Sequence, residues 1–177
     1  MKTFKILFAA VIIAGFATSA IADDPQYSDQ SNVTASAVVV TDISIENVRN
    51  VQFGVVARGN EAKLGATDNV ATNAGLGDSG YQLGRIHVSS SEHVAFRFDF
   101  DASVVLSNQN GEATMTFEPS VTHTSDEGAE FGSSETDLGN VISAGNDFFF
   151  IGGTMDVADG QETGNYEGTF QVSVEYL

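Results

Sequence analysis

Three histidines, His87, His93 and His123, are the first candidates for metal binding or proton transfer. Imidazole binds transition metals and exchanges its proton near neutral pH. These histidines lack the H-x-x-x-H spacing of a zinc site, and the sequence contains no cysteine that would complete a soft-metal site. His87 stands between Ile86 and Val88, so strand alternation turns its ring away from the core. We therefore expect no metal centre and no cofactor.

Other residues with catalytic potential also lack the necessary context. GLGDSG at residues 75–80 has the letters of a dinucleotide fingerprint, but no strand pattern precedes it and no helix pattern follows it. No serine lies in a G-x-S-x-G nucleophile elbow. The carboxylate pairs Asp99/Asp101 and Asp126/Glu127 fall on solvated strand faces or in loops. These patterns predict a protein without catalytic activity.

The first 22 residues have the organisation of a secretory signal. Lys2 and Lys5 precede an apolar run over residues 6–17, and Ala20 and Ala22 form an A-x-A cleavage site. The run is too short to span a bilayer, and no later stretch is long and apolar enough to do so. We expect an exported protein that passes through the periplasm to the cell surface, a fimbrium or the medium. Residues 1–22 would be its signal peptide and residues 23–177 its mature domain.

Export makes a direct prediction about the mature N-terminus. Cleavage after Ala22 gives a protein that begins at Asp23. N-terminal sequencing of extracellular material checks this, and recovery of chains that retain Met1 or Lys2 would contradict it.

The mature chain is strongly acidic. Loss of Lys2 and Lys5 leaves 5 basic against 24 acidic residues, a net charge of −19. Such a surface repels nucleic acid and anionic lipid, so neither is an expected partner. The acidity fits either calcium binding or a solvated, self-repelling surface, and the absence of calcium-loop spacing favours the solvated surface. The sequence leaves calcium dependence open.

Strand patterns account for most of the mature chain. Period-two alternation predicts about seven or eight short strands. The expected strands lie at residues 33–46, 51–56, 85–89, 94–106, 115–117, 149–157 and 170–176. Asn110-Gly111 has the composition of a hairpin turn, and Gly152-Gly153 that of a bulge or a close backbone approach. Residues 59–83 and 125–147 should be loops. The pattern predicts an all-β, antiparallel, immunoglobulin-like sandwich.

The two ends of the mature domain carry related patterns. The apolar face of the last strand consists of Phe170, Val172, Val174 and Tyr176. Small apolar residues alternate near the start of the domain, at Val33, Ala35, Ala37 and Val39. A strand that pairs within its own chain and one that pairs with a neighbour have the same period, so periodicity leaves both pairings open.

Two longer stretches carry a family resemblance. ASAVVVTDISIENVRNVQFG at residues 35–54 and FFFIGGTMDVADGQETGNYEGTFQVSVEY at residues 148–176 resemble a family of bacterial exported proteins labelled a domain of unknown function. That family is similar to the pilins of alternative chaperone–usher fimbriae, such as the Mat or common pilus, and to spore coat U proteins. Two details are also typical of chaperone–usher pilins, the penultimate Tyr176 and a glycine, Gly164, at the fourteenth position from the end.

The resemblance implies an incomplete sandwich with a groove beside the last strand. A periplasmic chaperone would fill the groove before an outer-membrane usher assembles the subunits, and the N-terminal donor strand of another subunit would then replace the chaperone. Residues 23–40 would contain that donor. The expected partners are copies of this chain or related pilin subunits. A monomeric secreted sandwich that binds a glycan or calcium through residues 59–83 and 125–147 is the alternative.

Overall fold

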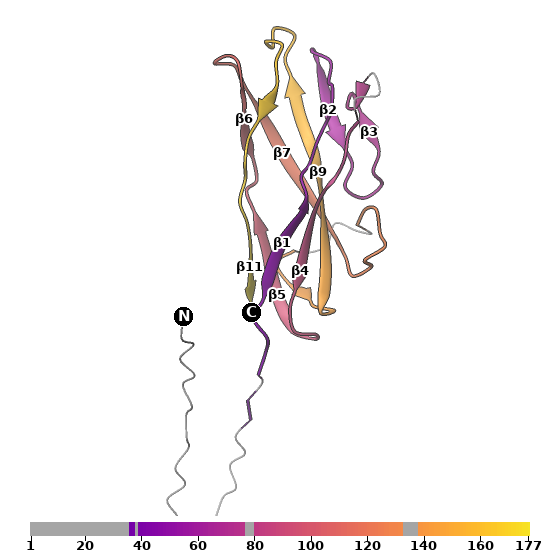
Figure 1. Cartoon of the computed structure of the whole chain (residues 1–177), viewed down its shortest axis with the longest axis vertical. Coiled ribbons are helices and arrows are strands. Elements are labelled where there is room, and N and C mark those ends of the chain that lie inside the picture. Colours follow the sequence, from indigo (N-terminus) through magenta and orange to yellow (C-terminus); the bar gives the residue numbers. More distant parts are fainter. Residues whose placement is uncertain (1–35, 38, 77–79, 133–137) are drawn as a thin grey trace, which may run out of the picture. The chain divides into compact units, whose positions relative to one another are not determined.

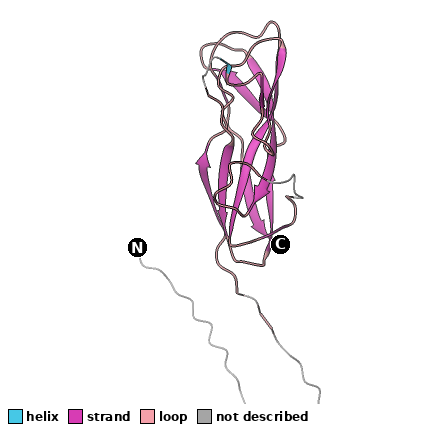
Figure 2. Ribbon diagram, turned by 90° about the vertical axis from the view of Figure 1, so that its right-hand side faces the viewer, coloured by secondary structure: helices cyan, strands magenta, loops and turns pink. Residues whose placement is uncertain are grey.

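The computed structural model describes residues 36, 37, 39–76, 80–132 and 138–177. The chain divides at residue 37, and the fold described below is that of residues 38–177. Its described residues contain eleven β-strands, all paired antiparallel (Figures 1 and 2). The predicted all-β antiparallel sandwich is therefore confirmed.

The strands form a large sheet and a small sheet. The large sheet has the order β1-β4-β9-β7-β6-β10, and β2 and β3 extend it beside β9. Its strands are β1 (Ser44–Arg49), β2 (Asn60–Leu64), β3 (Ala71–Thr72), β4 (Gly84–Ser89), β6 (Val104–Asn108), β7 (Thr114–Thr124), β9 (Asn146–Val157) and β10 (Tyr166–Glu167). The small sheet has the order β11-β5-β8. Its strands are β5 (Ala95–Phe100), β8 (Val141–Ile142) and β11 (Val172–Tyr176).

The main core lies between these two sheets. Phe98 of β5 stacks on Phe149 of β9, with ring centroids 4.0 Å apart and ring planes within 9° of parallel. The other buried members of this core are Ile86, Val88, Phe96, Val121, Val141 and Ile151. Alternation produces this arrangement because each strand turns every second side chain inward. The stacked phenylalanines join the sheets across the interior, where aromatic pairs add stability beyond their buried area.

A second apolar cluster covers the opposite face of β4 and β9. Phe148 and Phe150 lie there, and the guanidinium of Arg85 sits 4.4 Å from the ring centroid of Phe148. Nη2 of Arg85 donates a hydrogen bond of 2.6 Å to the carbonyl of Glu127. Arg85 therefore fastens the start of the segment at residues 125–147 over this sheet face.

Several predicted strands and turns agree with the structure. The strand expected at residues 85–89 is β4, the one at 149–157 is the main part of β9, and the one at 170–176 contains β11. Asn110 and Gly111 lie in the turn that joins β6 to β7, as predicted. The single strand expected at residues 94–106 is divided, because the chain leaves the small sheet after β5 and enters the large sheet as β6.

Other expectations were wrong. Residues 51–56 form no strand and make only one isolated bridge, between Gln52 and Gln82. Three of their apolar side chains, Val51, Phe53 and Val56, nevertheless pack against the core, and Phe53 contacts Phe117 edge-to-face. The segment at residues 59–83 is not wholly a loop, because it includes β2 and β3, and residues 125–147 include β8. The strand expected at residues 33–46 begins only at Ser44 within the described residues.

Gly152 and Gly153 allow a close backbone approach, as predicted. A Cβ atom on Gly152 would collide with the carbonyl oxygen of Leu64, and one on Gly153 with the carbonyl oxygen of Glu118. Gly153 also has a φ of 143°, which side chains rarely permit. The pair lets β9 lie between β2 and β7 without a steric conflict.

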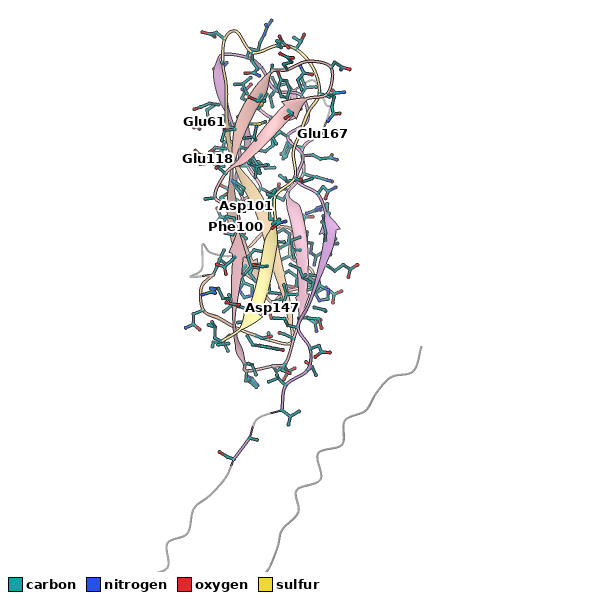
Figure 3. All side chains as sticks on the ribbon, turned by 90° about the vertical axis from the view of Figure 1, so that its left-hand side faces the viewer. Glu61, Phe100, Asp101, Glu118, Asp147 and Glu167 are labelled. Carbon is teal, nitrogen blue, oxygen red and sulfur yellow. The ribbon has the colours of Figure 1, made fainter. Side chains whose placement is uncertain are left out.

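Two successive strand pairs form a ribbon that runs from the small sheet into the large sheet. β5 pairs with β11 in the small sheet, and their continuations β6 and β10 pair with each other in the large sheet. At the crossing, the backbone N–H of Gln171 donates to the carboxylate of Asp101 over 2.9 Å. Figure 3 shows Asp101 beside the beginning of β11. The ribbon thus connects the layers along one side of the sandwich (Figure 1).

Candidate functional site at the seam between β1 and β11

The terminal strand β11 is an edge strand whose inward face is only partly covered. It pairs with β5 and with no other strand in the described part of the chain. Its cross-strand partners Phe96 and Phe98 are 0% and 2% exposed. The four predicted apolar residues pack against the same core yet are all only half-buried, namely Phe170, Val172, Val174 and Tyr176. The inward face of β11 is therefore less well covered than that of its partner strand β5.

The backbone of β11 also has a free side. The carbonyl of Gln171 accepts a hydrogen bond from Asp101, and the N–H of Leu177 donates to Ala95 over 3.0 Å. In an antiparallel ladder, alternate residues bond to the same neighbour. The odd-numbered residues of β11 therefore bond to β5, and the N–H and C=O groups of the residues between them point away from it. Those residues are Val172, Val174 and Tyr176.

The edge of the large sheet lies opposite this free side. β1 pairs only with β4 among the described strands, and it approaches β11 without forming a ladder with it (Figure 1). Ile45 of β1 stands across from the fully buried Val88, yet it is 41% exposed. We call this region the β1–β11 seam, and it consists of the two free strand edges with Ile43, Ile45, Val172, Val174 and Tyr176.

Hydroxyl groups connect β1 and β11 at one end of the seam. The backbone N–H of Ser91 donates to the Tyr176 hydroxyl over 2.7 Å. Ser91 Oγ accepts from the N–H of Thr41 over 2.7 Å and lies 2.9 Å from its hydroxyl. Burial raises the pKa of Tyr176, but hydrogen bonds with Ser91, Thr41 and Ser90 outweigh it and leave the pKa below its usual value. We call Thr41, Ser90, Ser91 and Tyr176 the hydroxyl cluster.

A series of hydrogen bonds through buried polar side chains holds the hydroxyl cluster in place. Ser90 Oγ lies 2.5 Å from Ser143 Oγ, which donates to Asp147 over 2.9 Å. Asp147, which is labelled in Figure 3, is fully buried, and its other carboxylate oxygen lies 2.8 Å from Nε2 of His123. Asp147 stands between the serine and the histidine, so the imidazole is not placed to deprotonate Ser143 as in a catalytic triad. These hydrogen-bonded side chains position the backbone segments that carry the hydroxyl cluster.

Because His123 contacts the buried Asp147, replacing His123 should destabilise the fold far more than replacing the exposed His93. His123→Asn shortens the side chain and leaves the buried carboxylate without this partner, which should lower the free energy of unfolding by about 3 kcal/mol. His93→Asn is the matched control, because the His93 side chain is 88% exposed and asparagine tolerates its positive φ of 61°. Denaturant unfolding measures both. Equal stability of the two variants would contradict a supporting role for His123.

Only some of the predicted site residues lie in the part of the chain that the structure describes. Ala20, Ala22, Val33 and Ala35 lie outside the described residues. In the donor segment, Ala37 is exposed, and Val39 is 94% exposed.

Gly164 precedes β10, where an added Cβ would collide with the side chain of Asn108 at the end of β6. The glycine therefore supports the ribbon and lies outside the seam as defined here. Sequence patterns missed the hydroxyl cluster, because its four residues come from three distant segments with no shared motif.

The remaining candidate residues are not assembled into a second site. His87 faces away from the main core, as predicted, and stacks on Phe148 with centroids 4.9 Å apart. Within the described ranges, no three acidic or histidine side chains are gathered closely enough to hold a metal ion. Residues 77–79 of the glycine-rich GLGDSG stretch lie outside the described residues. No helix in the described part is long and apolar enough to cross a membrane.

Fold and site together define an antiparallel β-sandwich with an exposed terminal edge strand. The chain belongs to the family described as Domain of unknown function (DUF4402), whose pattern matches residues 43–176. The match begins just before β1 and ends with Tyr176, so it includes all the strands that the structure describes and the whole β1–β11 seam. No curated protein matches the sequence.

Proposed function

We propose that this protein is a non-catalytic structural subunit of an extracellular fibre or surface coat that polymerises by strand addition. In this proposal, the N-terminal donor segment of one copy lies along the free edge of β11 in another. The observation that carries the proposal is the half-buried apolar face of β11 beside a free backbone edge.

Strand addition fits the chemistry of this edge. The backbone groups of Val172, Val174 and Tyr176 offer hydrogen bonds to an added strand, and their side chains offer an apolar surface to every second residue of it. An unprotected edge of this kind is an aggregation hazard, which natural proteins usually blunt or cover. Occupation by another chain covers it.

The donor segment has the complementary pattern. Val33, Ala35, Ala37 and Val39 place small apolar side chains at every second position. The exposure of Ala37 and Val39 leaves them available to another copy. Because donor and acceptor are different surfaces, the contact is head-to-tail and extends into a fibre instead of closing as a dimer.

Export and the resemblance to chaperone–usher pilins supply the proposed partners. In transit through the periplasm, a chaperone would cover the β11 edge, and an outer-membrane usher would exchange it for the next subunit. The partners in the finished fibre would be copies of this chain or related pilins.

Two measurements test the proposal. Purified mature protein should give a ladder of oligomers in unheated gel electrophoresis that collapses to monomer on boiling. Negative-stain microscopy of material sheared from cells should show fibres or a coat that disappear when the gene is deleted. A mature chain that stays monomeric at high concentration without a chaperone would overturn the proposal and favour a monomeric binding module.

A further inference from the structure

Alternation alone does not fix where a donor strand stops along β11. Val33, Ala35, Ala37 and Val39 are all apolar, so a slip of two residues again presents an apolar side chain to the core. Only odd slips are penalised, since they turn the polar face inward. A fibre with a defined repeat therefore needs another feature to set the register.

The hydroxyl cluster lies where it can provide that feature. Thr41 precedes β1, Tyr176 ends β11, and Ser91 lies in the connection that carries the chain from β4 to β5. Hydrogen bonds of 2.7 Å from the N–H of Thr41 to Ser91, and from the N–H of Ser91 to Tyr176, connect the two sides of the seam. The β4–β5 connection joins the two sheets covalently at the same end, so it blocks a strand that lies in the seam from extending further. We call this connection, residues 90–94, the wall.

The wall is polar, and its position is held by buried contacts. Ser90 bonds to Ser143, Ser143 bonds to the fully buried Asp147, and the N–H of Ser90 donates to the carbonyl of Gly145 over 3.0 Å. These bonds join the β4–β5 connection to the segment before β9. The cluster is therefore a fixed structure and not a set of free surface hydroxyls.

The donor segment has polar residues where such a wall requires them. Continuing its inward positions past Val33 and Val39 gives Ser31 on one side and Thr41 on the other. Thr41 is held in the hydroxyl cluster of its own copy by Ser91, so Ser31 is the residue that a donor running antiparallel to β11 brings to the cluster of the next copy. Ser31 can exchange a further hydrogen bond with the Tyr176 hydroxyl, whereas an apolar side chain at that position would desolvate the hydroxyl and give it no new partner.

We propose that the hydroxyl cluster is an end-stop that sets the register of the incoming donor strand from a second copy of this chain. The inference rests on the proposed function and assigns register selection to Tyr176 and Ser91. The apolar part of the seam gives the donor its affinity, and the hydroxyl cluster determines which of the registers two residues apart is occupied.

The absence of cysteine from the native sequence makes the register measurable by disulfide mapping. Ser173 lies on the outward face of β11, so Ser173→Cys would lie beside an outward residue of the donor. We combine it in the full-length mature chain with Asn32→Cys, Thr34→Cys, Ser36→Cys or Val38→Cys, one at a time. Only neighbouring pairs have the spacing for a disulfide, and each disulfide between copies adds a covalent step to a non-reducing ladder.

One pair should cross-link about tenfold more than any other, the preference that one or two hydrogen bonds provide. Adding Tyr176→Phe, which removes only the hydroxyl, should reduce this preference to about twofold and spread the cross-links over positions two residues apart. Ser91→Ala removes the bonds to Thr41 and should have the same effect. Tyr166→Phe is the matched control, because its hydroxyl bonds to Gln161 and Glu162 in the segment before β10; it should leave the preference unchanged.

The outcomes separate the two proposals. A single dominant pair that persists in Tyr176→Phe and Ser91→Ala overturns the end-stop and leaves strand addition in place. No cross-link between copies from any of the four pairs overturns strand addition itself. A disulfide within one chain, seen as a monomer with altered mobility, shows that the segment pairs with its own β11.

Discussion

Deletion of residues 23–40 should abolish polymerisation while leaving the domain folded. The deletion removes none of the eleven described strands, which begin at Ser44, and it retains Thr41 of the hydroxyl cluster. We expect the thermal unfolding midpoint of the truncated chain to stay close to that of the full-length monomer. Size-exclusion chromatography and unheated gel electrophoresis should show monomer only. If the truncated chain is unfolded by circular dichroism, residues 23–40 contribute a strand to their own domain and the donor assignment is wrong.

The truncated domain should take up a synthetic donor. A peptide with the sequence SNVTASAVVV, residues 31–40, should bind it and raise its unfolding temperature, because the ligand binds only the folded state. Replacing Ala37 by arginine should weaken binding about hundredfold, since a charge would be placed against the core without a partner. The control peptide carries arginine at Ser36, on the outward face, and should bind nearly as well as the native sequence. Equal binding of both variants would contradict the predicted inward face.

Val174→Asp should prevent assembly at a moderate cost to the subunit. Val174 packs against the core opposite Phe98 but is only half-buried, so a carboxylate there retains some contact with water. We expect a loss of about 2 kcal/mol in the free energy of unfolding, and no oligomer ladder, because an added strand would bury the charge completely.

Val105→Asp provides the matched control for this substitution. Val105 lies on β6 and is 62% exposed, so the same change should leave both stability and the ladder nearly unaltered. Denaturant unfolding and unheated gels measure the two effects separately. A Val174→Asp variant that polymerises normally would show that β11 is not the acceptor edge.

Strand faces could be predicted from the sequence because burial repeats every second residue. Alternation places Phe96 and Phe98 on one face of the strand expected at residues 94–106, and both lie in the main core with Phe149. No comparable periodic pattern in the sequence indicates which strands pair with each other by hydrogen bonds. The apolar alternation over residues 94–106 continues across the point where the chain changes sheets, so periodicity alone merged β5 and β6 into one strand. Likewise, Phe53 is half-buried against the core without belonging to a strand, which is why residues 51–56 were predicted incorrectly.

Only the apolar residues of the candidate site could be predicted from the sequence. Val172, Val174 and Tyr176 were identified from their alternation, whereas the exposed edge beside them depends on the sheet order. β2 was missed because its sequence NEAKL is mostly polar, although Ala62 and Leu64 are fully buried. The hydroxyl cluster depends on contacts between residues up to 85 positions apart, and serine and threonine are too common in this chain for such contacts to show in a local pattern.

The ribbon shared by the two sheets has a mechanical consequence. A pull along β11 would be carried through its ladder with β5 and, beyond the crossing at Asp101, through β10 and β6 into the large sheet. The load would act along the strands, so neighbouring hydrogen bonds would be sheared together and not opened one after another. Both layers would then share the tension, and a fibre built from such subunits would resist stretching until whole ladders failed at once.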